Sequence, residues 1–212
     1  MKVALINGSP KPRSSASAML LDGLRACLPA GLECVECPLH AVRPAEDPAR
    51  LLLDTDALVL ACPVYVDGLP AHLLTALEGL EAPLRRGGHG QRVYALVNCG
   101  FYEGAQTVNA LDMLRCWSGR AGLIWGRGMG VGAGGALHAL KKIPMGEPPK
   151  AALGEALAGL AADIAAGDGG PHVFSAPELT REEHCDATQR VWRRLAAANG
   201  LTEEDLNKTE FT

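Results

Sequence analysis

Short apolar runs alternate with segments of helical spacing along this 212-residue chain. Strands that are buried on both faces of a parallel sheet are apolar at every position, whereas half-exposed strands alternate apolar and polar residues. The runs that are continuous or nearly so lie at residues 3–6, 32–37 (the weakest), 57–62, 93–97 and 122–125 (a shorter one). This pattern predicts a five-stranded parallel sheet.

Helical stripes follow these runs, with apolar residues spaced three, four and seven positions apart. The stripes are Leu20, Leu24, Cys27 and Leu28; Pro70, Leu73, Leu77 and Leu80; Ala110, Met113, Leu114 and Trp117; and Leu153, Leu157, Leu160 and Ile164. A short additional helix is predicted at "EDPARLLLD", with Asp47 as N-cap and Pro48 in its first turn. Repeated strand–helix units predict a three-layer α/β sandwich with helices on both faces of the sheet.

The pattern changes after about Gly167. Thr180 and Glu183 have capping-box spacing and predict the start of a helix, which Asn199-Gly200 would end. One face of this helix carries Cys185, Thr188, Trp192 and Leu195. We therefore expect an α/β domain over residues 1–168 and a C-terminal helical extension of it over residues 169–212.

Composition excludes several classes of partner. Hydrophobic residues make up 48% of the chain, charged residues 21%, and the net charge is −4, which argues against a nucleic-acid partner. The first apolar run is too short for a signal peptide, and no apolar segment of about 20 residues is present to span a membrane. The seven cysteines are an odd number in a chain without a secretion signal, which predicts reduced thiols and a cytoplasmic location.

The stretch "INGSPKPRSSAS" joins the first predicted strand to the first predicted helix. Backbone N–H groups and the helix dipole favour an anion at such a junction. Hydroxyls and cations that suit an anion come from Ser9, Lys11, Arg13, Ser14, Ser15 and Ser17. The loop lacks the Gly-Lys pair of a nucleoside-triphosphate loop, the further glycines of a dinucleotide loop, and a phosphatase cysteine. A terminal phosphomonoester remains the predicted ligand, and a merely well-capped helix remains the alternative.

The same stretch resembles the phosphate loop of the flavodoxin-like, NAD(P)H-dependent FMN reductase family, with its pattern G-S-P-[RK]-x-x-S-x-[ST]. The resemblance implies that Ser9, Lys11, Ser15, Ser17 and the backbone amide of Ala16 surround the FMN phosphate. The family more often has asparagine where this chain has Ala16, so here only the backbone contact is expected.

Two further loops carry the resemblance. "CPVYVDGLPAHLLTALE" is similar to the family pattern P-[VI]-Y-x-x-x-x-P-x-x-L-K, and "NCGFYEG" is similar to its N-[CG]-G loop. A flavodoxin-like strand order, 2-1-3-4-5, would bring both beside the first loop at the carboxyl ends of the strands. The resemblance implies that the isoalloxazine ring is bordered by Pro63, Val64 and Tyr65 on one side and by Asn98, Cys99, Gly100 and Phe101 on the other.

The stretches "AGLIWGRGMGVGAGGAL" and "RVWRRLAAANGLTEEDL" also resemble one branch of this family, which is related to multimeric flavodoxins and iron–sulfur flavoproteins. The chain lacks the compact cysteine cluster of the iron–sulfur members. The resemblance therefore extends over nearly the whole chain and makes residues 1–168 an FMN-binding domain.

Two motifs are weighed against this interpretation. Gly130, Gly132 and Gly135 satisfy G-x-G-x-x-G, but no ribose-binding acid follows at the usual distance, so a flexible loop near the flavin edge is favoured. Cys34 and Cys37 form C-x-x-C, but a strand points these two side chains to opposite faces and no second pair accompanies them. We expect no metal site.

The predicted function is an FMN-dependent oxidoreductase that takes hydride from NADH or NADPH and passes electrons to a quinone, flavin or other small-molecule acceptor. Hydride transfer to a flavin needs no acid–base pair, so no catalytic side chain is assigned. A homodimer or higher homo-oligomer is expected. The first alternative is a flavodoxin-type electron carrier that binds FMN without oxidising NAD(P)H. A phosphate-binding hydrolase is disfavoured, because no nucleophile or metal cluster accompanies the loop.

Overall fold

The structure, a computed structural model, describes residues 1–11, 14–40 and 47–208. These residues form a six-stranded, fully parallel sheet in the order β2-β1-β3-β4-β5-β6. The strands are β1 (Lys2–Asn7), β2 (Glu33–Pro38), β3 (Ala57–Pro63), β4 (Arg92–Asn98), β5 (Ile124–Val131) and β6 (Val173–Ser175). The predicted order 2-1-3-4-5 is confirmed, and β6 is an addition that the sequence did not predict.

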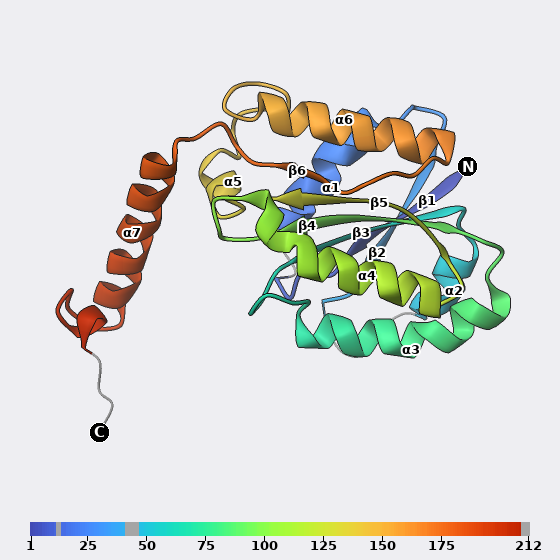
Figure 1. Ribbon diagram of the computed structural model, residues 1–212, viewed down its shortest axis with the longest axis horizontal. Coiled ribbons are helices and arrows are strands. Elements are labelled where there is room, and N and C mark those ends of the chain that lie inside the picture. Colours follow the sequence, from blue (N-terminus) through green and yellow to red (C-terminus); the bar gives the residue numbers. More distant parts are fainter. Residues whose placement is uncertain (12–13, 41–46, 209–212) are drawn as a thin grey trace. The chain divides into compact units, whose positions relative to one another are not determined.

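Helices cover both faces of the sheet, as predicted (Figure 1). The helices of this part are α1 (Ala16–Cys27), α2 (Pro48–Leu53), α3 (Ala71–Gly87), α4 (Val108–Arg120), α5 (Ala136–Ala139) and α6 (Ala151–Ala166), with a 3-10 turn η1 (Gly104–Thr107) before α4. The α1 and α6 helices lie over one face, and α3 and α4 lie over the other. None of the helices in the described ranges combines the length and apolar character needed to cross a bilayer.

Two apolar cores lie on opposite faces of the sheet, and successive residues of the inner strands alternate between them. Val3 and Leu5 of β1 pack toward α1 and α6, whereas Ala4 and Ile6 pack toward α3 and α4. This burial on both faces explains why the inner strands are apolar at every position. In β2, Cys34 and Cys37 contribute to different cores, so the two cysteines point to opposite faces, as their spacing predicted.

The fifth strand differs from its prediction over residues 122–125. It begins at Ile124 and continues to Val131 with the sequence IWGRGMGV. A Cβ at Gly126 would lie 2.6 Å from the Tyr94 ring, and one at Gly128 would lie 2.7 Å from Leu111. Close packing thus requires glycine here, and the strand loses the apolar side chains by which strands are recognised in a sequence.

The chain divides into two compact units, Met1–Glu178 and Leu179–Thr212. We predicted the boundary at residue 168. The sheet continues beyond that point, because β6 pairs with β5 through Met129–Val173, Gly130–Phe174 and Val131–Ser175.

The second unit contains α7 (Arg181–Ala198) and a 3-10 turn, η2 (Asp205–Asn207). The predicted capping box is present at the start of α7: the Thr180 hydroxyl accepts from the Glu183 N–H, and the Glu183 carboxylate accepts from the Thr180 N–H. The helix ends before Asn199, and Gly200 has a φ of 74°, which matches the predicted stop signal.

Buried acids predict a loss of stability at alkaline pH. Burial raises the pKa of the Cys62 thiol from 9.0 to about 12 and raises the pKa of Tyr94 from 10.0 to about 12. The unfolded chain therefore releases these protons first, so their stabilisation is complete below about pH 9 and declines as the pH approaches 12. We expect the urea midpoint to fall between about pH 8 and about pH 11, and to fall less in Cys62→Ala. The exposed Cys116 provides the control: Cys116→Ala should keep the wild-type pH dependence, and an equal dependence in all three proteins would contradict the prediction.

Candidate functional site

A cavity of about 250 Å³ lies at the carboxyl ends of the central strands. We call it the loop cavity; it is lined by Ser9, Lys11, Ser15, Ala16, Ser17, Pro63, Val64, Tyr65, Asn98, Cys99, Gly100, Gly134, Gly135 and His138. The structure therefore brings together every residue of the predicted site except Phe101, which is 53% exposed and does not line the cavity. Arg13 lies outside the described residues, and Ser14 is exposed and does not line the cavity.

Parallel register explains why three loops that are distant in sequence meet here. Asn7 at the end of β1 pairs with Ala61, near the end of β3. Pro63 at the end of β3 pairs with Asn98 at the end of β4. Because parallel strands end at the same edge of a sheet, the segments that follow β1, β3 and β4 emerge side by side.

Three buried serine hydroxyls face the loop cavity: Ser9 is 3% exposed, Ser15 3% and Ser17 1%. Each oxygen accepts a hydrogen bond: from the Lys11 N–H to Ser9 (3.3 Å), from the Ala18 N–H to Ser15 (3.1 Å) and from the Asn98 amide to Ser17 (2.9 Å). In the described part of the chain none of the three hydroxyls donates to another group. A hydroxyl whose oxygen is already used as an acceptor still has its hydrogen to offer, so the cavity presents three O–H donors.

Backbone and charge add to this donor set. Ser15 is the N-cap of α1, and the first N–H groups of a helix, here those of Ala16 and Ser17, have no partner within the helix. The helix dipole places partial positive charge at the same point. Lys11 lines the cavity, and no Asp or Glu is among the described residues that line it. The arrangement favours an anion with several acceptor oxygens.

Asn98 connects two of the loops. Its amide nitrogen donates to the Ser17 hydroxyl and, at 3.1 Å, to the Cys62 carbonyl. The side chain is 5% exposed, so these bonds form away from water, where losing one is costly. Asn98 thereby holds the start of α1 against the end of β3, a role that the sequence did not indicate.

Two glycines at the cavity leave space that no protein atom fills. A Cβ added at Gly100 or at Gly135 would meet no heavy atom within 4 Å, and neither residue has a positive φ. Neither packing nor backbone conformation therefore requires glycine at these positions. The absence of side chains keeps backbone accessible to a ligand.

Cys99 lies in the cavity as a thiol rather than a thiolate. It is 3% exposed, and its sulfur lies within hydrogen-bonding distance of the carbonyls of Phe101 and Glu103. Burial raises the pKa of this thiol. A thiol that stays protonated at neutral pH is a poor nucleophile, which agrees with the packing role expected from the sequence.

A tight turn holds Tyr65 at the rim of the cavity. The backbones of Tyr65 and Gly68 exchange two hydrogen bonds, of 2.9 and 3.2 Å. The two residues between them have positive φ, 49° at Val66 and 59° at Asp67, as in a type I′ turn. Val66 is fully exposed, and a β-branched residue in this conformation is strained.

Relief of this strain should stabilise the protein. Asparagine tolerates positive φ far better than valine does, so we expect Val66→Asn to increase the free energy of unfolding by about 1 kcal/mol. Urea denaturation measures the change. Val108 is also exposed but has a φ of −56°, so Val108→Asn should not stabilise the protein, and equal effects at the two positions would argue against strain at Val66.

The fold matches that of solved structures. An NADH:FMN oxidoreductase in its apo form has a TM-score of 0.58, with 17% identity over 78% of this chain and 89% of its own. An NADPH-quinone reductase from P. pentosaceus has a TM-score of 0.55, with 17% identity over 78% of this chain and 98% of its own. A flavodoxin from Streptococcus pneumonia TIGR4 has a TM-score of 0.55, with 15% identity over 79% of this chain and 99% of its own. No protein-family model and no curated protein matches the chain.

The chain has the flavodoxin-like fold. In such open α/β sheets, ligands bind beyond the carboxyl ends of the strands, where the strand order reverses. In this flavodoxin-like sheet the order reverses at β1, which lies between β2 and β3, and the loop cavity begins directly after β1.

Three residues that line the cavity, Gly134, Gly135 and His138, were not assigned to the site from the sequence, although the glycine motif that contains Gly135 was expected to lie near the flavin edge. They follow the carboxyl end of β5, and the misplaced fifth strand hid this position. Had the strand been predicted to end at Val131, these residues would have been expected at the site, because ligands bind beyond the carboxyl ends of parallel strands.

Proposed function

We propose that the protein binds FMN noncovalently in the loop cavity, takes hydride from NADH or NADPH, and passes electrons to a quinone, flavin or other small-molecule acceptor. The observation that carries the proposal is the set of three buried serine hydroxyls with hydrogens to offer, at the N-terminus of α1 and beside Lys11. A phosphomonoester has the acceptor oxygens and the negative charge that suit this set.

Each loop has a distinct part in this proposal. Ser9, Ser15 and Ser17, with Lys11 and the backbone amide of Ala16, hold the phosphate. The carboxyl ends of β3 and β4 and the residues that follow them border the ring with Pro63, Val64 and Tyr65 and with Asn98, Cys99 and Gly100, and Gly100 and Gly135 leave room beside it. When bound, FMN supplies a ring that accepts a hydride and returns two electrons.

The chain itself supplies position and environment rather than a proton donor or acceptor. Cys99, whose pKa is raised by burial, keeps its proton and adds no charge beside the ring. The absence of carboxylates among the described lining residues spares a bound phosphate from like-charge repulsion. Tyr65 is 47% exposed, so a second ligand could reach this rim of the cavity from solvent.

The test begins with the visible spectrum of protein reconstituted with FMN. We expect bands near about 370 and about 450 nm that leave with the cofactor on acid precipitation. Anaerobic stopped-flow mixing with NADH and with NADPH should then bleach the longer-wavelength band at a rate that saturates with nucleotide concentration. A chain that does not bind FMN at micromolar concentration would refute the proposal.

The electron carrier is the second candidate, because a flavodoxin is among the similar folds. Both candidates bind FMN, so the reduction experiment separates them. If neither nucleotide reduces bound FMN and a ferredoxin-type donor does, the chain is a carrier. If a nucleotide does reduce it, turnover with a quinone should follow ping-pong kinetics.

We also propose that the protein forms a homodimer or a higher homo-oligomer. One face of α7 carries Cys185, Thr188, Trp192 and Leu195; Trp192 is 59% exposed and Leu195 is 47% exposed. Neighbouring Val191 is 44% exposed. Exposed apolar residues grouped in this way are typical of association surfaces.

The charged double variant Trp192→Glu/Leu195→Glu should shift the protein toward monomer in sedimentation velocity, because a carboxylate is costly to bury in an apolar interface. Glu182→Lys/Asp186→Lys changes charge on the same helix without altering this face and serves as the control. A wild-type protein that sediments as a monomer at all concentrations would contradict the proposal.

A further inference from the structure

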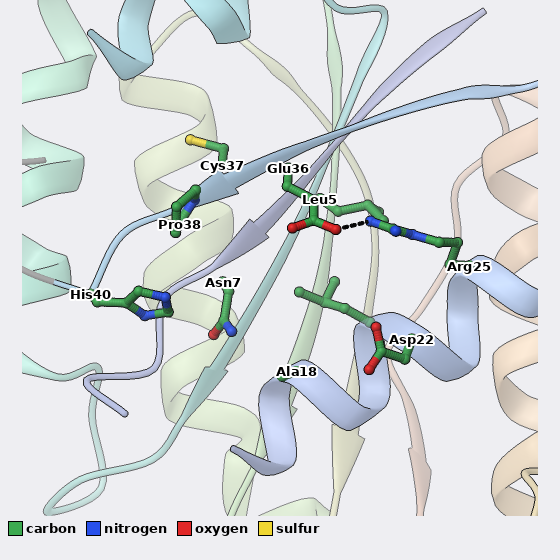
Figure 2. A pocket seen from close by; sticks show the side chains of 10 residues that line it. Leu5, Asn7, Ala18, Asp22, Arg25, Glu36, Cys37, Pro38 and His40 are labelled. Carbon is green, nitrogen blue, oxygen red and sulfur yellow. Dashed lines mark hydrogen bonds and ion pairs between the residues drawn. The ribbon is translucent and has the colours of Figure 1, made fainter. Parts of the chain in front are cut away.

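A second cavity, of about 190 Å³, adjoins the first loop (Figure 2). We call it the α1–β2 cavity; it is lined by Leu5, Asn7, Ala18, Leu21, Asp22, Arg25, Glu36, Cys37, Pro38 and His40. The figure shows His40 beside Asn7 at one end, and the Arg25–Glu36 ion pair (2.7 Å) at the other. His40 reaches the proposed phosphate loop from this cavity, as Asn7 does.

His40 bonds to the backbone of Ser9. Its Nδ1 lies 2.8 Å from the Ser9 carbonyl oxygen. A carbonyl oxygen can only accept, so Nδ1 must carry the proton and donate it. The register of the sheet explains the approach: Asn7 pairs with Pro38, so the residues just after β1 and β2 leave the sheet together.

This hydrogen bond orients the Ser9–Pro10 peptide unit, which can form few other hydrogen bonds. Ser9 precedes Pro10, and proline has no N–H. The Ser9–Pro10 peptide therefore has one polar group, the Ser9 carbonyl, and that group is bound by His40. The Ser9 N–H is bound separately, by the Asn7 side chain at 3.1 Å.

We propose that His40 is a positioning residue that turns the Ser9 carbonyl oxygen away from the anion site and so sets the selectivity of the loop for a phosphate. The inference rests on the proposed binding of FMN. His40 lines the α1–β2 cavity and not the loop cavity, whereas Ser9 lines the loop cavity. The bond therefore directs the carbonyl oxygen toward a residue of the α1–β2 cavity.

The consequence is electrostatic. Without the His40 donor, the Ser9–Pro10 peptide can rotate and present a partial negative charge to the hydroxyls of Ser9, Ser15 and Ser17. A phosphate dianion is repelled by such an oxygen, and a neutral ribityl hydroxyl is not. Loss of His40 should therefore weaken FMN binding much more than riboflavin binding, whereas a general loss of order would weaken both.

Titration of the full chain with FMN and with riboflavin, followed by flavin fluorescence, tests the proposal. We expect His40→Leu and His40→Ala to raise the Kd for FMN about tenfold and the Kd for riboflavin less than about twofold. His40→Asn retains a side-chain N–H near the position of Nδ1 and should recover most of the FMN affinity. Asp22→Asn alters the charge of the same cavity without touching the loop and should bind both flavins as the wild type does.

Thermal unfolding of each variant identifies those that are folded, and His40→Ala stands in for His40→Leu if the latter does not fold. Equal weakening of FMN and riboflavin, no weakening, or a failure of His40→Asn to recover FMN affinity would each overturn the positioning role while the proposed function stands. A wild-type chain that binds neither flavin would remove the proposed function and this inference with it.

Discussion

Replacing both Ser15 and Ser17 with alanine is expected to weaken FMN binding about a hundredfold while changing riboflavin binding little. Both hydroxyls are buried, at 3% and 1% exposure, and both face the loop cavity. Two lost hydrogen bonds to a charged phosphate correspond to about 3 kcal/mol. Riboflavin lacks the phosphate, so its affinity depends on the ring-bordering segments, which the variant retains.

The variant needs two controls, because both side chains also support the fold. Ser15 caps α1 through the Ala18 N–H, and Ser17 accepts from Asn98, so some loss of stability is expected. Unfolding curves measure that loss directly. The exposed Ser14 does not line the cavity, and Ser14→Ala should bind FMN as the wild type does. Parallel losses for FMN and riboflavin would mean that the loop holds something other than a phosphate.

The second large effect is expected at Gly132, where alanine should destabilise the protein by about 2–4 kcal/mol. A Cβ at this position would overlap the Tyr102 carbonyl oxygen and lie 2.6 Å from the Gly104 nitrogen and 2.7 Å from the Glu103 carbonyl carbon. These are backbone atoms, which cannot turn aside as a flexible side chain can. The strain would be transmitted to the segment after β4 that carries Cys99 and Gly100.

Gly135 is the matched control within the same G-x-G-x-x-G motif. A Cβ there would meet no heavy atom within 4 Å, so Gly135→Ala should alter the free energy of unfolding by less than about 1 kcal/mol. Chemical denaturation of the two variants beside the wild type measures the difference. Equal stability of Gly132→Ala and Gly135→Ala would contradict the prediction, because it would mean that the backbone after β4 shifts to accommodate the new methyl group at little cost in stability. If this contrast is observed, close packing accounts for Gly132 and open space accounts for Gly135. The G-x-G-x-x-G pattern then needs no dinucleotide-binding site to explain it.

The sequence predicted most of the site because the site is defined by strand ends. The resemblance to the reductase family named the residues, and the apolar runs that lead into Gly8, Pro63 and Asn98 placed them at the carboxyl edge of the sheet, where the structure brings all but Phe101 together. The buried stripes on α1, α3, α4 and α6 were predictable because apolar residues at helical spacing mark the buried side of a helix, but Met113, which was assigned to the α4 stripe, is exposed.

Local patterns could not predict features that depend on side chains from elsewhere. The glycines of β5 are explained by Tyr94 and Leu111, which lie on other elements, so the strand had no apolar signature of its own. The pairing of β6 depends on β5 and extends over only three residues. The roles of Asn98 and His40 depend on partners 81 and 31 positions away, and no spacing rule connects such pairs.

The pairing of β1 has a consequence for how the chain reaches its native state. Both its neighbours, β2 and β3, come later in the sequence and are joined to it through helical crossovers. Among the described residues, the antiparallel contact between Tyr65 and Gly68 is the one strand pairing formed within a local turn. Loop closure must therefore precede every ladder of the sheet, which makes folding slow compared with that of hairpin-rich or helical domains. During that delay the apolar segment of β1 is without partners, and a chaperone that binds short apolar segments would find a target in it.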